Sequence, residues 1–152
     1  VLKLVDGRVP LLIEIKLHSH HTYPCVLMDK LLQGYKGSYC IESFNSLALF
    51  WYRRNRPDVV RGQLSSNLTS PVAEGGYVLS FLVKHLLTNC IGRPDFIAYC
   101  YKDSRNLSFC LNHHLYKTPV FAWTLRTPEA YEKYKKRFDS VIFDSFLPRR
   151  QA

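Results

Sequence analysis

The sequence has no Cys-x-x-Cys pair, no low-complexity segment and no internal repeat, and acidic residues are scarce in it. Its five cysteines are odd in number, which argues against both a disulfide framework and a zinc site. We therefore expect reduced thiols and a cytoplasmic protein. With 21 Lys and Arg against 12 Asp and Glu, the formal net charge is +9. A charge of this sign favours phosphate esters, nucleic acid or an acidic membrane surface as partners.

No apolar run is long enough to cross a membrane. The longest candidate, residues 77–90, has 14 residues and is interrupted by Lys84 and His85, whereas a membrane-spanning helix needs roughly 20. We expect a helix that packs on the domain. The alternative is peripheral contact, in which this helix lies on a membrane surface through its lysine and its basic flanks.

Hydrophobic residues make up 47% and aromatic residues 14% of the 152 residues, which is enough for one globular domain with a core. The first residue is Val1 rather than Met, and an apolar run begins within ten residues of it. We interpret residues 1–152 as a piece of a longer protein.

Short apolar runs alternate with helical patterns along the chain. We expect strands at residues 10–16, 38–44, 59–64, 96–100, 119–125 and 141–143. The expected helices occupy about residues 24–33, 47–56, 77–90, 104–115 and 127–138. Alternating strands and helices predict an α/β fold with a parallel sheet and right-handed crossovers. The first strand is expected to be buried on both faces.

Glu14 and Lys16 stand two residues apart in this first apolar strand. Side chains at i and i+2 of a strand point to the same face, so the two charges project together. Charges on an apolar strand are costly to bury unless they are paired or bound to a ligand. A metal, a phosphate or a mutual ion pair would each satisfy them, and the residues alone leave these alternatives open.

The carboxyl ends of parallel strands are where α/β folds gather functional side chains. The expected strand ends carry a ring of polar residues with one aromatic wall: Glu14, Lys16, residues 42–45, Gln63, Ser65, Tyr99, Trp123 and Thr124. Glu14 is a hard oxygen ligand suited to Mg²⁺ or Ca²⁺. Lys16 could neutralise a phosphoryl oxygen, and Trp123 could pack on the apolar part of a substrate. The alternative is a structural ion pair and a core tryptophan.

Two further groups of residues are interpreted as solvated surface. His18, His20 and His21 have no accompanying carboxylate or thiol, so we expect a loop rather than a metal site. The basic residues on helices are Arg53, Arg54, Arg56, Lys133, Lys135, Lys136 and Arg137. Aromatic residues do not interleave with them as a base-stacking platform would require, so we do not expect nucleic acid as a partner.

Five blocks in chain order resemble the C-terminal part of the glycerophosphodiester phosphodiesterase family. They are residues 9–16 (VPLLIEIK), 41–45 (IESFN), 56–64 (RPDVVRGQL), 120–127 (VFAWTLRT) and 140–148 (SVIFDSFLP). The resemblance implies a (β/α)₈ barrel of the triosephosphate isomerase type. It also implies metal-dependent hydrolysis of glycerophosphodiesters to glycerol 3-phosphate and an alcohol.

The same resemblance assigns roles to residues of this chain. Glu14 would be a metal ligand, with Mg²⁺ or Ca²⁺ as the cofactor, and Lys16 would act catalytically at the phosphoryl group. Trp123, Ser43 and Gln63 would bind the substrate. The family's H-R-G and E-x-D segments, which supply two more metal carboxylates and catalytic histidines, do not precede Glu14 here.

The departure from the family pattern shapes the functional hypothesis. We expect residues 1–152 to be the C-terminal part of a single barrel domain, with six of the eight βα units and an incomplete active site. A missing N-terminal segment or a partner chain would complete the barrel, and the isolated chain is expected to be inactive. The alternative function is a non-catalytic module that binds anionic head groups or a membrane surface.

Overall fold

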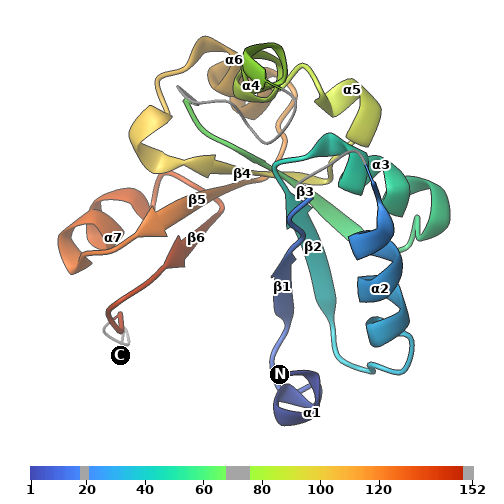
Figure 1. Ribbon diagram of the computed structural model, residues 1–152. Coiled ribbons are helices and arrows are strands. Elements are labelled where there is room, and N and C mark those ends of the chain that lie inside the picture. The colour runs from blue at the N-terminus through green and yellow to red at the C-terminus, as the bar shows by residue number, and fades with distance from the viewer. Residues whose placement is uncertain (18–20, 68–75, 149–152) are drawn as a thin grey trace.

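A computed structural model of the chain describes residues 1–17, 21–67 and 76–148 (Figure 1). Six parallel strands form one sheet in which each strand pairs with its neighbours in sequence. The strands are β1 (Leu11–Glu14), β2 (Tyr39–Ser43), β3 (Val60–Ser65), β4 (Phe96–Cys100), β5 (Val120–Leu125) and β6 (Ser140–Phe143). The sheet curls into a half-barrel with β1 and β6 at its two edges (Figure 1). The predicted parallel α/β architecture is confirmed.

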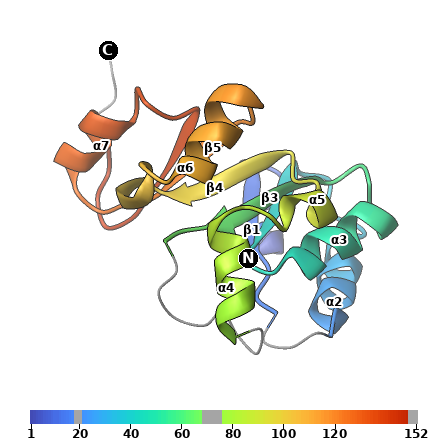
Figure 2. The same cartoon turned by 90° about the horizontal axis from the view of Figure 1, so that it is seen from above.

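Helices cover the convex side of the curled sheet (Figures 1 and 2). They are α2 (Tyr23–Leu32), α3 (Ser46–Asn55), α4 (Gly76–Lys84), α5 (Asn89–Gly92), α6 (Leu107–Cys110) and α7 (Pro128–Tyr134), while the short α1 (Leu2–Val5) lies at the amino end of β1. A 3₁₀ turn, η2 (Tyr101–Asp103), follows β4, and a π-helical turn, η3 (Leu111–Leu115), continues α6. No helix among the residues that the structure describes is long and apolar enough to cross a membrane.

Side-chain caps explain where several of these helices begin. The Asn45 side chain accepts a hydrogen bond from the Leu47 backbone N–H at the start of α3, at 3.0 Å. Thr127 caps α7 in the same way through the N–H of Ala130, at 3.2 Å, and Pro128 occupies the first helical position. Such caps satisfy N–H groups that the first helical turn leaves without partners. The predicted Thr127 cap is confirmed.

The single helix predicted for residues 77–90 is wrong, because the segment divides into α4 and α5. Leu86 adopts a left-handed backbone conformation between them, with φ of 57°. Its side chain is buried in a cluster with Ile97 and Val120. The turn at Leu86 therefore directs an apolar side chain into the core, and this burial ends the helix. The short helix α1 was not expected from the sequence.

Two apolar clusters join the sheet to the helices on its convex side. The larger consists of Ile15, Leu17, Cys25, Ile41, Ala48, Leu49, Tyr52 and Val59. The second consists of Leu86, Ile97, Tyr99, Phe109 and Val120.

The prediction that the first strand is buried on both faces is wrong, because Leu12 and Glu14 are exposed.

A third cluster fills part of the concave side. Leu64, Phe96 and Ala98 are buried there, and Cys40, Phe44, Phe121 and Trp123 pack against them. The rings of Phe96 and Phe121 stack with their centroids 4.5 Å apart. A Cβ atom on Gly62 would lie 2.1 Å from Cζ of Phe96, so only glycine leaves room for this ring.

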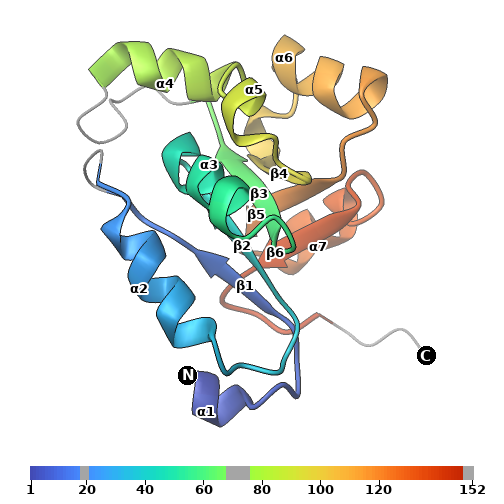
Figure 3. The ribbon, with the colours of Figure 1, turned by 90° about the vertical axis from the view of Figure 1, so that its right-hand side faces the viewer.

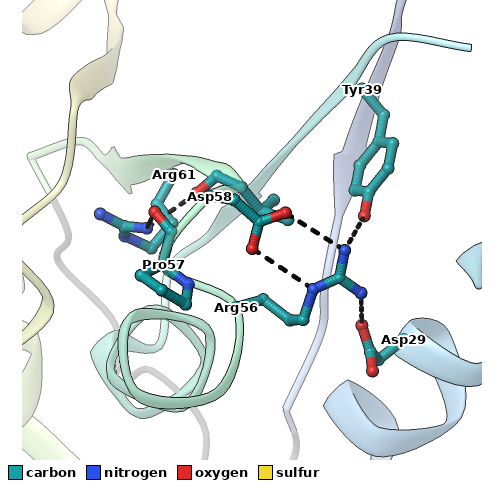
Figure 4. A network of polar contacts seen from close by, with 7 residues as sticks. Asp29, Tyr39, Arg56, Pro57, Asp58 and Arg61 are labelled. Carbon is teal, nitrogen blue, oxygen red and sulfur yellow. Dashed lines mark hydrogen bonds and ion pairs between the residues drawn. The ribbon is translucent and has the colours of Figure 1, made fainter.

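Arg56, at the end of α3, is an anchor rather than part of a solvated face (Figure 4). Its guanidinium forms ion pairs with Asp29 of α2 and with Asp58, the latter at 3.3 Å. It also donates a hydrogen bond to the hydroxyl of Tyr39 on β2, at 3.4 Å. The prediction of a solvated Arg56 is therefore wrong, whereas Arg54 is exposed as predicted. Arg56 fixes α2 and α3 against the start of β2.

Candidate active site

The concave side of the sheet carries the charged residues at the carboxyl ends of β1 and β2. Glu14 and Glu42 are directly paired in the parallel register, as are Leu12 and Cys40. Paired residues of neighbouring strands point to the same face of a sheet, and neighbouring strands lie about 4.8 Å apart. Two carboxylates therefore stand side by side on this face.

Glu14 and Lys16 form the ion pair that their spacing allows. The Nζ atom of Lys16 lies 3.7 Å from Oε2 of Glu14, and the two side chains are 68% and 35% exposed. The prediction that both charges project from one face is confirmed. An exposed pair of this kind contributes at most about 1 kcal/mol to stability. The contact therefore leaves both groups accessible to a ligand.

Glu42 is a charged residue of this face that the sequence places in the ring of strand-end polar residues without assigning it a role. It is only 7% exposed, and its Oε2 atom has no hydrogen-bond partner. Burial, reinforced by the neighbouring charge of Glu14, raises the pKa of Glu42 to about 7. The sequence signal for a buried Glu42 is a carboxylate that directly follows the apolar residues Cys40 and Ile41 in a predicted strand. Such a group needs a proton or a cation to be neutralised.

Trp123 forms an aromatic wall on the same concave side. Its indole Nε1 donates a hydrogen bond to the carbonyl oxygen of Ala98, at 2.9 Å. Its ring meets the ring of Phe44 edge-on, with 5.7 Å between the centroids. Phe44 directly follows β2, so this wall extends from β5 toward the strand that carries Glu42. The indole is fixed by a hydrogen bond and by packing, and it is only partly buried.

Ser43 and Gln63 alternate with the residues of the concave face and point to the helix side. The Ser43 hydroxyl donates to the carbonyl oxygen of Ile15, at 2.6 Å, and accepts from the Asn45 N–H. The fully buried Gln63 amide donates to the carbonyl oxygens of Ser43 and Phe44, at 3.2 and 3.1 Å. These contacts hold the turn from β2 into α3 in place.

The described residues offer a limited set of metal ligands. No group of three or more His, Cys, Asp or Glu side chains within residues 1–17, 21–67 and 76–148 is arranged to hold an ion. Two of the three neighbouring histidines, His18 and His20, lie outside the described residues. Glu14 and Glu42 supply carboxylate oxygens, which are the ligands that Mg²⁺ and Ca²⁺ prefer. The two residues fit part of a divalent-cation site.

Comparison with known proteins gives matches in structure and none in sequence. No family model and no curated protein matches the chain. A Silicibacter pomeroyi protein assigned as a glycerophosphoryl diester phosphodiesterase matches 93% of this chain and 50% of its own, with a TM-score of 0.72 and 19% identity. A glycerophosphodiester phosphodiesterase from Parabacteroides distasonis matches 89% and 52%, with a TM-score of 0.61 and 14% identity.

A third solved structure is an Oleispira antarctica phosphodiesterase in complex with the product sn-glycerol-3-phosphate. It matches 86% of this chain and 49% of its own, with a TM-score of 0.58 and 16% identity. The chain thus spans about half the length of the three solved structures. The resemblance found in the sequence blocks is confirmed for the fold, and the chain is a partial (β/α)₈ barrel like those of glycerophosphodiester phosphodiesterases.

Proposed function

We propose that this chain is the C-terminal part of a glycerophosphodiester phosphodiesterase barrel and that its concave face carries part of the active site. The observation that carries the proposal is the arrangement of Glu14, Lys16 and Trp123. A carboxylate, an accessible ammonium and a fixed aromatic ring occupy one face of the sheet. The fold of the matched phosphodiesterases, one of them bound to sn-glycerol-3-phosphate, supports the proposal.

Each of the three residues has a role that suits its chemistry. Glu14 would hold a divalent cation, Mg²⁺ or Ca²⁺, which when bound supplies positive charge to a phosphoryl oxygen. The Lys16 ammonium, which is accessible on the same face, would contact another phosphoryl oxygen and stabilise its charge. The Trp123 ring would pack against the apolar part of the glycerol or of the alcohol. Substrate binding by Ser43 and Gln63 stays a prediction, since their described contacts are with the turn after β2.

We also propose that these 152 residues alone do not hydrolyse substrate. The sequence contains neither an H-R-G nor an E-x-D segment, the segments that the family resemblance assigns to acid–base catalysis and to the other metal carboxylates. General acid–base catalysis needs a titrating group within hydrogen-bond reach of the reacting oxygens. Glu14 and Lys16 would bind and orient a phosphate ester, while the resemblance assigns the acid–base pair to histidines outside these residues.

The purified chain tests both parts of this proposal. We expect no choline release from glycerophosphocholine with Mg²⁺ or Ca²⁺, and metal-dependent turnover would contradict the proposed inactivity. We expect sn-glycerol-3-phosphate with Mg²⁺ to shift the indole N–H resonance of Trp123 and not that of Trp51, which packs with the helices. Lys16→Met should weaken this binding at least fivefold, whereas Lys30→Met on α2 should not. Equal binding by both variants would contradict the assigned site.

A second candidate function rests on the surface of α4 and α6. Tyr77, Val78 and Phe81 of α4 are exposed, and so is Leu107 of α6. The two helices adjoin, because His85 Nδ1 lies 3.1 Å from the Ser108 hydroxyl.

A pocket of about 460 Å³ beside these residues is lined by Lys84, Lys102 and Arg105. Apolar side chains next to cations suit the surface of an anionic bilayer. The chain should therefore sediment with phosphatidylglycerol vesicles at low salt and less with phosphatidylcholine vesicles. Phe81→Ser should weaken this binding, and Phe50→Ser on α3 should not. Equal sedimentation with both lipids would contradict a surface that recognises anionic head groups.

A further inference from the structure

The buried carboxylate of Glu42 has no role in the function proposed above. Its side chain comes from strand β2 and not from a loop, so its position is fixed by the β1–β2 and β2–β3 pairings. The Oε2 atom is sealed from solvent and has no hydrogen-bond partner among the described residues. Leaving such an oxygen without a partner is destabilising, and more so when the group is charged. This destabilisation would be removed if the Oε2 atom had a partner.

Protonation alone does not explain the arrangement. The charged form faces Glu14 across the strand pair without a counter-ion. The neutral form still leaves Oε2 without a hydrogen-bond partner. A cation shared with Glu14 would satisfy this oxygen and remove the repulsion between the carboxylates.

No cationic side chain of the described residues is paired with Glu42. Lys16 forms its ion pair with Glu14, and no ion pair of the described residues involves Glu42. Cys40 shares the face two residues away, but a thiol is a soft ligand. The ligand set that remains is two carboxylates, which suits a hard divalent cation.

We propose that Glu42 is a second carboxylate ligand of the divalent cation held by Glu14. The inference rests on the proposed function for Glu14 and adds a ligand from the next strand. The two carboxylates then bind the cation from adjacent, hydrogen-bonded strands, which fixes its position relative to the aromatic wall of Phe44 and Trp123. The buried Glu42 contributes the oxygen that solvent does not reach, and Glu14 contributes the one that faces solvent.

Direct binding of Mn²⁺ to the purified chain tests the proposal without any measurement of activity. Electron paramagnetic resonance measures the concentration of free Mn²⁺ in titrations of the wild type, Glu42→Gln, Glu14→Gln and Glu129→Gln. Glutamine keeps the size of the side chain and removes its charge. We expect Glu42→Gln and Glu14→Gln each to weaken binding at least tenfold, while Glu129→Gln on α7 matches the wild type. Circular dichroism confirms that each variant is folded.

The outcomes separate this inference from the proposed function. A normal affinity for Glu42→Gln together with loss of binding for Glu14→Gln would overturn the role of Glu42 and leave that of Glu14 in place. A normal affinity for both variants, or no binding by the wild type at millimolar Mn²⁺, would overturn both. A second measurement covers the case in which Glu42→Gln unfolds. Bound Mn²⁺ should then broaden the backbone resonances of Ile13–Ile15 and Ile41–Ser43 most strongly in the wild type, and broadening that is strongest elsewhere would contradict the site.

Discussion

Gln63 in β3 and Ser46 at the start of α3 are joined by a hydrogen bond of 3.0 Å, in which the serine hydroxyl donates to Oε1 of the glutamine. Both side chains are buried. The Gln63 amide nitrogen also donates to the carbonyl oxygens of Ser43, Phe44 and Leu64. One side chain thus satisfies several buried polar groups where β2 turns into α3.

Replacing this amide should destabilise the fold. Gln63→Leu keeps much of the volume but leaves a buried hydroxyl and buried carbonyl oxygens without a partner, so we expect a loss of about 2–4 kcal/mol in the free energy of unfolding. Urea denaturation measures the difference. Gln33→Leu, at an exposed position after α2, is the matched control and should be within about 0.5 kcal/mol of wild type. A small effect at Gln63 would mean that water replaces its contacts.

The pKa of Glu42 predicts how stability changes with pH in the absence of metal. The folded state keeps the proton to about pH 7, whereas the ordinary pKa of 4.5 applies to the unfolded chain. Between these values the unfolded state binds fewer protons, so the free energy of unfolding should fall as pH rises from about 4.5 to 7 and then level off. The expected loss is at most about 3–4 kcal/mol.

Comparison with Glu42→Gln isolates this contribution from the other titrating groups. As pH rises over the same range, the variant should become increasingly more stable than the wild type, because glutamine carries no charge. Denaturation in EDTA at several pH values gives the two curves. Parallel curves would show that the Glu42 carboxyl keeps an ordinary pKa.

Gly62 and Gly34 form a matched pair for testing the packing of the concave face. A Cβ atom on Gly62 would meet the Phe96 ring, while one on Gly34 would meet nothing within 4 Å. Gly62→Ala should cost about 1–3 kcal/mol, because the Phe96–Phe121 stack must move. Gly34→Ala should have little effect or be slightly stabilising. Thermal unfolding of the two variants checks the difference, and equal melting temperatures would contradict the close approach of Phe96.

Arg56 should contribute more to stability than its exposed neighbour Arg54. Arg56→Met removes the ion pairs to Asp29 and Asp58 and the hydrogen bond to Tyr39. We expect a loss of about 1–2 kcal/mol, because Asp29 is largely buried and loses its cation. Arg54→Met is the control and should change stability little. If raising the salt concentration removed the whole difference between the two variants, the Arg56 contact would be an ordinary surface pair.

The sequence predicts the six strands and their parallel order because apolar runs separated by helical patterns leave few alternatives. It also predicts that Glu14 and Lys16 share a face, since that follows from the period of a strand alone. It does not predict which residues of different strands share a face. That depends on register, and register places Glu42 beside Glu14 while turning Ser43 and Gln63 toward the helices.

The break at Leu86 was beyond sequence reasoning for a similar reason. Residues 77–90 have a continuous helical pattern, and nothing local marks a left-handed residue in it. The cavity that receives Leu86 is formed by Ile97 of β4 and Val120 of β5, which come later in the chain. Tertiary packing decides the backbone conformation here, and local propensity does not.

The edge position of β1 has a consequence for amide hydrogen exchange. The N–H groups of Leu11 and Ile15 donate to the carbonyl oxygens of Ser38 and Glu42, so the odd-numbered amides of this strand face β2. The amides of Leu12 and Glu14 point the opposite way, toward the free edge of the sheet, because β1 is its first strand and pairs only with β2 (Figure 3). Along one short strand, slow and fast deuterium uptake should therefore alternate residue by residue. A strand that pairs with this edge would slow deuterium uptake at the Leu12 and Glu14 amides. Exchange at these two amides would therefore detect the added strand.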